Sequence, residues 1–441
     1  MFKQILKKAV VSILTLEARL VLGKYKPKII AVTGSVGKTG TKDAIRAVLE
    51  QSFFIRGSKK SYNSEIGVPL TILGAENAWG SPFLWLKVFF EGLLLILLKN
   101  HYPDWLILEV GVDHPGDMRR VTQWLVPDVV VLTRFSEVPV HLEFFPSREA
   151  LVGEKKILAR ALKADGVLIV NADDAEVQAL RQGHQGTSFS FGFGESADIR
   201  GTSERLAYDQ TGMPNGMTVE IQQGGSKEEV SIKNVLGRPV LYSVLAASAV
   251  GIALGIPLKN IAKASASLST APGRMRTIRG VQGSLIIDDS YNSSPGAARE
   301  ALETLQEIGI KTSETDPASG GRKIALLGDM LELGKESAAE HKKIGALAKE
   351  ICNVLVTVGV RSSWFEEGAR AKKMKKADIF HFGNATEAGE FLRGFLREGD
   401  VILVKGSQSG IRLERAVKLI MAEPNRAREL LVRQEDEWGR R

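Results

Sequence analysis

The amino-acid sequence predicts an α/β fold in two parts, a central domain built on a parallel sheet and a smaller α/β domain after it. The chain has 441 residues, more than one hydrophobic core usually serves. Short runs rich in β-branched residues alternate with helical stretches, which is typical of a parallel sheet with helices on its faces. The break Ala271-Pro272-Gly273 divides this alternation into two series, and the second series is typical of a Rossmann-like domain.

The expected boundaries follow from this break and from the basic N-terminus. We predict an N-terminal helix over residues 1–26, a central domain over 27–271 and a C-terminal domain over 272–441. Residues 183–233 are rich in Gly, Ser and Thr, so an antiparallel β appendage is expected there, followed by an Ala-rich helix over 241–254. The strand candidates are Ile29–Thr33, Trp105–Val110, Val129–Thr133 and Val167–Asn171 in the first series, and Leu285–Asp288, Lys323–Leu327, Val354–Val358 and Val401–Val404 in the second.

Much of the positive charge lies at the N-terminus. The formal net charge is +8, and residues 1–28 carry seven Lys or Arg against the single acid Glu17. The rest of the chain is nearly balanced, so no nucleic-acid partner is expected and an anionic membrane surface fits better. One apolar helical face is formed by Phe2, Ile5, Leu6, Ala9, Val10, Ile13, Leu16 and Leu20, and another face carries Lys3, Lys7, Thr15 and Arg19. This basic amphipathic helix is expected either to contact a membrane peripherally or to dock on the protein's own core.

A second apolar stretch, residues 83–98, contains Lys87 and Glu91 and is shorter than the roughly 20 residues that cross a bilayer. A helix packed on the core is the favoured interpretation, and a helix lying on the membrane is the alternative. No cleavage site for export follows the N-terminal helix. The single cysteine, Cys352, is expected to be buried and without chemistry, which fits a reducing cytoplasm.

The strand Ile29–Thr33 runs directly into Gly34-Ser35-Val36-Gly37-Lys38-Thr39, which has the pattern of a phosphate-binding loop. Its glycines allow backbone N–H groups to approach phosphate oxygens, Lys38 would reach the β- and γ-phosphates, and the Thr39 hydroxyl would coordinate Mg²⁺. Glu109 ends an apolar strand, where a carboxylate is well placed for the same ion. The sequence therefore predicts ATP and Mg²⁺ as cofactors.

The loop is a variant, because Val32 stands where the general motif has glycine, and it resembles the loop of the Mur ligases and their folylpolyglutamate synthase relatives. Further segments resemble Mur ligase motifs in the same order, namely Tyr62–Pro69, Leu108–Gly111, His141–Glu143 and Asn171–Asp174. By this resemblance Lys155 would be carbamylated and would share a metal ion with His141; Lys156 is the alternative. The resemblance implies metal binding by Thr39, Glu109, His141 and Lys155, catalytic roles for Lys38, His141 and Lys155, and nucleotide binding by Gly34, Ser35, Val36, Gly37, Lys38 and Thr39.

Two segments of the C-terminal domain, Pro272–Met275 and Asp288–Pro295, resemble the branch of the family that adds D-alanyl-D-alanine. In that branch the second segment contacts the nucleotide, so cofactor-binding roles for Arg274, Asp288 and Asn292 are implied. The segments Leu327–Gly334 with His341, and Val404–Ser407, also resemble this branch and are expected near the pocket of the incoming amine.

The chain departs from the family in three places. The resemblance begins near residue 28, whereas family members usually carry an earlier domain that grips a uridine nucleotide, so we expect that domain to be lacking and recognition of UDP is not implied. Pro239, Val240 and Ser243 replace polar residues that help to hold adenine in the family. Arg134 stands where Asn is common.

The resemblance implies an ATP-dependent amide-bond ligase of peptidoglycan precursor synthesis, monomeric and cytoplasmic, with the inner membrane surface as an alternative location. It would join D-alanyl-D-alanine, or a similar amine, to the carboxylate of a muramyl peptide through an acyl phosphate, giving ADP and phosphate. One alternative is a ligase acting on another carboxylate such as folate, against which residues 288–295 argue. The other is a non-catalytic, membrane-bound and nucleotide-dependent interaction protein, against which the retention of Lys38, Glu109, His141 and Lys155 argues.

Overall fold

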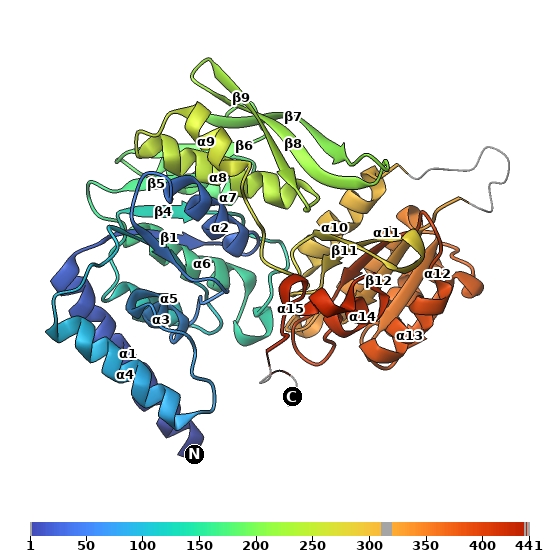
Figure 1. Ribbon diagram of the computed structural model, residues 1–441, viewed down its shortest axis with the longest axis horizontal. Helices are drawn as coiled ribbons and strands as arrows, with labels where there is room; N and C mark the ends of the chain where they lie inside the picture. Colours follow the sequence, from blue (N-terminus) through green and yellow to red (C-terminus); the bar gives the residue numbers. More distant parts are fainter. Residues whose placement is uncertain (1, 310–319, 436–437, 439–441) are drawn as a thin grey trace.

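The structure is a computed structural model that describes residues 2–309, 320–435 and 438. Two α/β lobes lie side by side (Figure 1), each built around its own sheet. The first sheet has the strand order β2-β3-β1-β4-β5-β6-β7-β8-β9, and the second has the order β10-β11-β15-β12-β13-β14. The predicted fold class, a central parallel-sheet domain followed by a smaller Rossmann-like one, is confirmed.

The first lobe begins with a long helix and then alternates strands with helices. Its strands are β1 (Lys28–Thr33), β2 (Ile55–Gly57), β3 (Trp105–Glu109), β4 (Val129–Leu132), β5 (Val167–Asn171), β6 (Ser188–Gly192), β7 (Ile199–Tyr208), β8 (Pro214–Gln223) and β9 (Ser226–Lys233). Its helices are α1 (Phe2–Tyr25), α2 (Lys38–Leu49), α3 (Gly67–Leu73), α4 (Pro82–Leu97), α5 (Asp117–Thr122), the 3-10 turn η1 (Leu142–Phe144), α6 (Arg148–Arg160), α7 (Ala175–Gln182), α8 (Arg238–Ala253) and α9 (Leu258–Ser265).

The second lobe repeats this alternation on a smaller scale. Its strands are β10 (Arg276–Arg279), β11 (Leu285–Asp289), β12 (Lys323–Gly328), β13 (Val354–Val358), β14 (Ile379–Phe382) and β15 (Val401–Lys405). Its helices are α10 (Pro295–Glu307), α11 (Ser337–Ile351), α12 (Ser363–Ala371), α13 (Ala385–Phe395), α14 (Glu414–Ile420) and α15 (Ala427–Leu430). The four strands predicted here are all present and pair in parallel. The short strands β10 and β14 were not predicted, because four residues of mixed burial give little periodicity.

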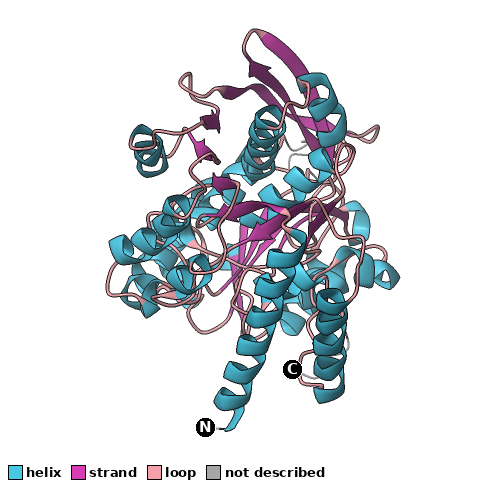
Figure 2. Ribbon diagram, turned by 90° about the vertical axis from the view of Figure 1, so that its left-hand side faces the viewer, coloured by secondary structure: helices cyan, strands magenta, loops and turns pink. Residues whose placement is uncertain are grey.

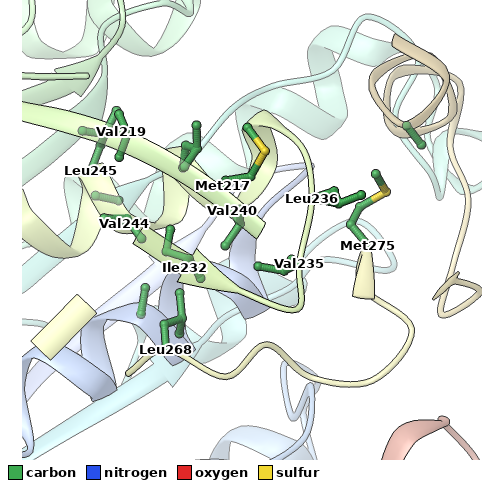
Figure 3. Close-up of a cluster of buried hydrophobic side chains, with 14 of the residues drawn as sticks. Met217, Val219, Ile232, Val235, Leu236, Val240, Val244, Leu245, Leu268 and Met275 are labelled. Atoms are coloured by element: carbon green, nitrogen blue, oxygen red, sulfur yellow. The ribbon is translucent and has the colours of Figure 1, made fainter. Parts of the chain in front are cut away.

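Helices cover both faces of the first sheet, as the central strand shows. Ile30 and Val32 of β1 belong to one buried cluster with α2 and α8, whereas Ile29 and Ala31 belong to another with α1, α3 and α6. Successive side chains of a strand point to opposite faces, so a strand that is apolar throughout requires cover on both sides. Figure 3 shows part of the first cluster, in which α8 packs on β8 and β9.

The predicted antiparallel appendage forms from β7, β8 and β9, which pair as successive hairpins. It is not separate from the main sheet. The strand β6 pairs in parallel with β5 and also with the start of β7, so the appendage extends the central sheet at one edge.

The predicted N-terminal helix forms, but the apolar stripe that α1 buries shares only Val10 with the predicted apolar face. Its buried apolar side chains are Val10, Leu14, Ala18 and Val21. Residues Ile5, Leu6, Ile13, Leu16 and Leu20 of the expected apolar face are exposed. The helix has two apolar stripes, and the spacing of apolar residues in the sequence does not show which stripe packs against the rest of the lobe.

The expectation that residues 83–98 pack on the core is wrong for most of the helix they form. Only Val88 and Gly92 of α4 are buried. Among the described residues, none of the helices combines the length and apolar character that a membrane span requires. Cys352 is a buried free thiol, as predicted, and burial raises its pKa to about 12.

Candidate functional site

The phosphate-binding loop, residues 34–37, joins β1 to the N-terminus of α2. Gly34 and Gly37 adopt φ angles of 146° and 85°, a region that favours glycine. A Cβ atom on Gly34 would lie 1.9 Å from Thr133 Oγ1, so the loop is pressed against the end of β4. Because α2 begins directly after this loop, its unpaired N–H groups face the space in front of it, which favours a bound anion.

Hydrogen bonds hold the loop in this shape. The Ser35 N–H donates to the Arg134 carbonyl at 2.7 Å, and the Thr133 hydroxyl donates to the Val36 carbonyl at 2.7 Å. Lys38 Nζ donates to the Gly34 carbonyl at 3.0 Å, and burial lowers the pKa of Lys38. Its amine therefore lies over the loop, where a phosphate group would offer a better acceptor than a carbonyl.

Glu109 occupies the carboxyl end of β3 and is 2% exposed. Its Oε2 accepts a hydrogen bond from the Thr39 hydroxyl at 2.9 Å, and its Oε1 accepts bonds from the Ser61 hydroxyl at 2.8 Å and from Asn63 Nδ2 at 3.1 Å. This convergence agrees with the predicted Mg²⁺ residues Thr39 and Glu109. Ser61 was not predicted, because a serine in a loop carries no signal of its own.

The oxygen donors fit Mg²⁺, which commonly takes one or two protein oxygens and completes its shell with phosphate oxygens and water. In the described part of the chain, no three His, Cys, Asp or Glu side chains are grouped as metal ligands. A cation at Thr39 and Glu109 would therefore depend on the nucleotide for further ligands.

Lys155 lies on the face of α6 that meets the phosphate-binding loop. Its Nζ is 2.9 Å from Ser35 Oγ, and the side chain is almost fully buried. Burial, together with the neighbouring charges of Lys38 and Arg148, lowers the pKa of Lys155 well below its ordinary value. The next residue, Lys156, instead lies 3.8 Å from Glu176, so Lys155 is the lysine that the fold turns toward the loop.

His141 lies where the two lobes meet. Its Nδ1 is 2.7 Å from Glu332 Oε2 of the second lobe, and its Nε2 is 3.4 Å from Asp113 Oδ1 of the first. The contact with His141 lowers the pKa of Glu332. Both ring nitrogens of His141 are therefore engaged with carboxylates in this conformation, and Glu332 belongs to the segment 327–334 that was expected near the site.

The second lobe contributes Arg274 and Asn292, which both line the cavity described below. Arg274 Nη2 lies 3.2 Å from Thr39 Oγ1, and its guanidinium stacks 4.0 Å from the ring centroid of Tyr291. The Asn292 carbonyl accepts a hydrogen bond from Lys405 Nζ at 3.0 Å. The contact between Arg274 and Thr39 connects the two lobes beside the phosphate-binding loop, whereas the contact between Asn292 and Lys405 lies within the second lobe.

Asp288 does not reach the cavity, in contrast to the prediction. It is fully buried in β11, its Oδ2 has no hydrogen-bond partner, and burial raises its pKa to about 6. The next residue, Asp289, lines the cavity and pairs with Lys405. Successive strand residues point to opposite faces, so the motif placed the right segment but the wrong carboxylate in the site.

A cavity of about 450 Å³ lies between the lobes in front of the loop. At its polar end it is lined by Lys38, Thr39, Glu109, His141 and Arg274. At its apolar end it is lined by Val235, Pro239, Val240, Ala297 and Ala301, of which Val235 and Val240 are labelled in Figure 3. We call these five residues the apolar slot, and apolar walls of this kind suit a purine base.

Residues at which this chain departs from the Mur ligase pattern lie at or beside this apolar end. The Ser243 hydroxyl donates to the Pro239 carbonyl at 3.1 Å. Arg134 forms an ion pair with Glu300 of α10, and Glu300 lines the cavity. Arg134 thus connects the end of β4 to the second lobe beside the apolar slot.

A second cavity of about 750 Å³ adjoins the first and shares Thr39, Ser61 and Arg274 with it. It is also lined by Lys59, Lys60, Tyr62, Trp79, Arg428, Arg433, Glu435 and Trp438. This cavity was not predicted, because residues 428–435 and Trp438 come from the far end of the chain. They reach the first lobe through an ion pair between Lys60 and Glu435 and a T-shaped contact between Trp79 and Trp438.

Comparison with known protein families identifies two domains. The model for the Mur ligase middle domain matches residues 32–84 and 91–251, and the model described as Mur ligase, glutamate ligase domain, matches residues 273–408. Together these matches span both lobes.

Curated relatives match over most of their own length. The UDP-N-acetylmuramoyl-tripeptide--D-alanyl-D-alanine ligase of Bacillus subtilis is 27% identical, with 92% of this chain and 79% of the relative covered. The enzyme of the same name from Mycobacterium leprae is 29% identical, with 86% of this chain and 71% of the relative covered.

Solved structures agree on the fold. The MurF ligase of Thermotoga maritima in complex with ADP aligns with a TM-score of 0.73 at 24% identity, covering 95% of this chain and 84% of that one. A MurF structure from Acinetobacter baumannii aligns with a TM-score of 0.71 at 24% identity, covering 90% and 78%.

Proposed function

This chain belongs to the Mur ligase family of ATP-dependent ligases, and from that premise we propose that it joins D-alanyl-D-alanine to the carboxylate of a muramyl peptide. The observation that carries the proposal is the convergence of Lys38, Thr39, Glu109 and Arg274 on one cavity between the lobes. Relatives named for this reaction supply the choice of substrates. Since ATP is the energy source, we place the reaction in the cytoplasm.

In the proposed first step, a substrate carboxylate oxygen attacks the γ-phosphorus of ATP and the bond to the β-phosphate oxygen breaks. The products are an acyl phosphate and ADP. Lys38 would move from the Gly34 carbonyl to the phosphates, and the loop N–H groups would face the same charge. Arg274 would add a second cation from the other lobe. The complete set of groups that stabilise the phosphate charge therefore forms only when the two lobes are together.

Mg²⁺, when bound, would neutralise charge on the β- and γ-phosphates. The Thr39 hydroxyl and the Glu109 carboxylate are its expected ligands, and their oxygens lie 2.9 Å apart. Ser61 and Asn63 orient Glu109 by donating to its second oxygen.

Lys155 and His141 are proposed to act on the acyl phosphate and its metal. A lysine reacts with carbon dioxide through its neutral amine, and the lowered pKa of Lys155 favours that form. The carbamate would replace the buried amine with an anion that could bind a second metal ion together with His141. That role requires His141 to exchange a carboxylate partner, Glu332 or Asp113, for the metal.

In the second step the dipeptide amine attacks the acyl carbon, phosphate leaves with the bonding electron pair, and the amine loses a proton as the amide forms. The second cavity opens beside Thr39 and Arg274 and carries Lys59, Lys60 and Arg433. Cations suit both substrates, because the dipeptide and the muramyl peptide each carry carboxylates.

Phosphate release tests the proposal. Purified protein should be given ATP, Mg²⁺, D-alanyl-D-alanine and muramyl peptides with and without UDP. We expect phosphate release and amide product only when both organic substrates are present. Release with folate and glutamate instead would identify the alternative ligase, and nucleotide binding without turnover on any pair would identify the non-catalytic alternative.

A further inference from the structure

The helices α1 and α4 lie side by side on the outer edge of the first lobe (Figures 1 and 2). Their C-terminal ends are joined by hydrogen bonds. Lys24 Nζ donates to the carbonyls of Leu95 at 2.9 Å and Ile96 at 3.0 Å, and the Tyr25 hydroxyl donates to the Leu95 carbonyl at 2.9 Å. The Lys24 cation therefore satisfies the carbonyls that end α4, a favourable position with respect to the helix dipole.

The helix α1 has one apolar stripe that is covered and another that is open. Val10, Leu14, Ala18 and Val21 pack into the buried cluster beneath the sheet and fix the helix along the lobe. The open stripe consists of Ile5, Leu6, Ile13, Leu16 and Leu20. A single surface helix in a water-soluble domain needs only the covered stripe.

The helix α4 is apolar around its whole circumference. Lys87 and Glu91 are its only charged residues, and they lie 3.7 Å apart as an ion pair. Its exposed large hydrophobic side chains, with the residue that follows the helix, are Phe83, Leu84, Leu86, Phe90, Leu93, Leu97 and Leu98. A helix that is hydrophobic on all sides is normally enclosed by protein or lipid.

We define the α1–α4 apolar surface as these two sets, the open stripe of α1 and the exposed side chains of α4. Together they are twelve of the seventeen large hydrophobic side chains exposed in the described part of the chain. Phe83 alone is 82% exposed. Such concentration distinguishes this surface from the scattered apolar residues found on most soluble proteins.

The charges around this surface are mainly positive. Lys7, Lys8 and Arg19 of α1 are exposed, and Lys99 follows α4. Of the nearby acids, Glu65 is paired with Lys7 at 2.9 Å and Glu91 with Lys87. An apolar face with a basic border matches the acyl boundary and the anionic headgroups of a bilayer. A second copy seated by two-fold symmetry would bring the like charges together.

We propose that the α1–α4 apolar surface seats this ligase on an anionic phospholipid bilayer. Leucine and phenylalanine side chains of both helices enter the acyl boundary, while Lys8 and Arg19 contact the headgroups. Because the covered stripe of α1 remains packed on the lobe, the protein binds as a folded unit along this edge. None of the surface residues lines either cavity, so this proposal stands or falls independently of the proposed reaction.

Co-sedimentation with vesicles tests the proposal on the full chain. We expect binding to vesicles of phosphatidylglycerol and phosphatidylcholine, weaker binding to phosphatidylcholine alone, and release as salt rises from about 0.1 to about 1 M. The double variant Leu16→Asp, Phe90→Asp should lose binding by roughly tenfold or more, since it places two charges in the acyl boundary. Val360→Asp is the matched control, because Val360 is 88% exposed on the second lobe.

A charge variant separates the basic border from the apolar part. Lys8→Glu with Arg19→Glu should reduce binding to the anionic vesicles by roughly tenfold at low salt and leave binding to neutral vesicles unchanged. Lys375→Glu with Lys376→Glu, two exposed positions on the second lobe, should bind like the parent. Circular dichroism of each variant confirms that it is folded.

Three results would overturn the proposal. The parent chain could fail to sediment with anionic vesicles. The folded Leu16→Asp, Phe90→Asp variant could bind as well as Val360→Asp. Light scattering without lipid could show a dimer that this variant dissociates, in which case a second copy covers the surface.

Discussion

The side-chain nitrogen of Lys155 lies 2.9 Å from the hydroxyl oxygen of Ser35, within the phosphate-binding loop. A buried amine with a lowered pKa is thereby held against the loop at which we propose that the phosphates bind. We predict that Lys155→Ala lowers kcat by roughly 100-fold and that added formate or acetate restores part of it, because a free carboxylate can occupy the place of the carbamate. Ligation rates measured with and without these anions check the prediction.

Lys156→Ala is the matched control for that experiment. Its side chain lies toward Glu176, so the variant should ligate at the parent rate and ignore added carboxylates. If Lys156→Ala shows the loss and the rescue instead, the position of the carbamylated lysine is off by one residue.

We propose that Lys38 and Glu109 act on the phosphates and their metal and do not hold the core together. We predict that Lys38→Ala and Glu109→Ala each lower ligation by roughly 100-fold or more, while the thermal unfolding profile stays like that of the parent. Lys263→Ala and Glu195→Ala, at exposed positions of the same lobe, serve as controls. Turnover near the parent rate in either site variant would refute the assignment of the loop.

Two adjacent carboxylates should behave differently. Asp289 lines the cavity beside Lys405, so Asp289→Asn should raise the KM for ATP by roughly tenfold. Asp288 points away from the cavity and is buried, so Asp288→Asn should leave this KM within about twofold of the parent. Initial rates over a range of ATP concentrations give the KM of each variant. A larger increase in KM for Asp288→Asn than for Asp289→Asn would instead support the role that the sequence motif implied for Asp288.

The different orientations of Asp288 and Asp289 show what could and could not be predicted from the sequence. The strands and the phosphate-binding loop were identified because they depend on neighbours in the chain, such as the apolar run 29–33 before Gly34. The resemblance placed the segment 288–295 at the site, but not the orientation of each side chain within it. Only the register of β11 with β15 decides that Asp289 faces the cavity.

Contacts between distant segments were also beyond prediction. Ser61 reaches Glu109 across 48 positions of the chain, and Glu435 reaches Lys60 across 375. No local pattern encodes such pairs. The same limit explains α1, whose two apolar stripes are visible in the sequence although only packing decides that Leu14 is covered and Leu16 is not.

Glu17 provides a prediction about stability and pH. Its carboxyl group lies in the contact between α1 and α4, so close that a Cβ atom on Gly92 would be 2.4 Å from Glu17 Oε2. That oxygen has no hydrogen-bond partner, and burial raises the pKa of Glu17 from 4.5 to about 7. Between pH 4.5 and about pH 7 the folded protein keeps a proton on Glu17 that the unfolded chain has released. The free energy of unfolding therefore falls as pH rises through this window. Above about pH 7 the full destabilisation by the buried, ionised carboxylate is present.

We therefore predict that Glu17→Gln raises the Tm, by little near pH 5 and by more near pH 8. The amide keeps the shape of the protonated acid and cannot ionise. The variant therefore does not lose the stability that the parent loses when Glu17 is deprotonated. Glu91→Gln, an exposed position on α4, should shift the Tm little and by the same amount at both pH values. Thermal unfolding followed by circular dichroism at each pH gives the comparison. A Tm difference for Glu17→Gln that does not grow with pH would show that the carboxyl group is already hydrated in the folded protein.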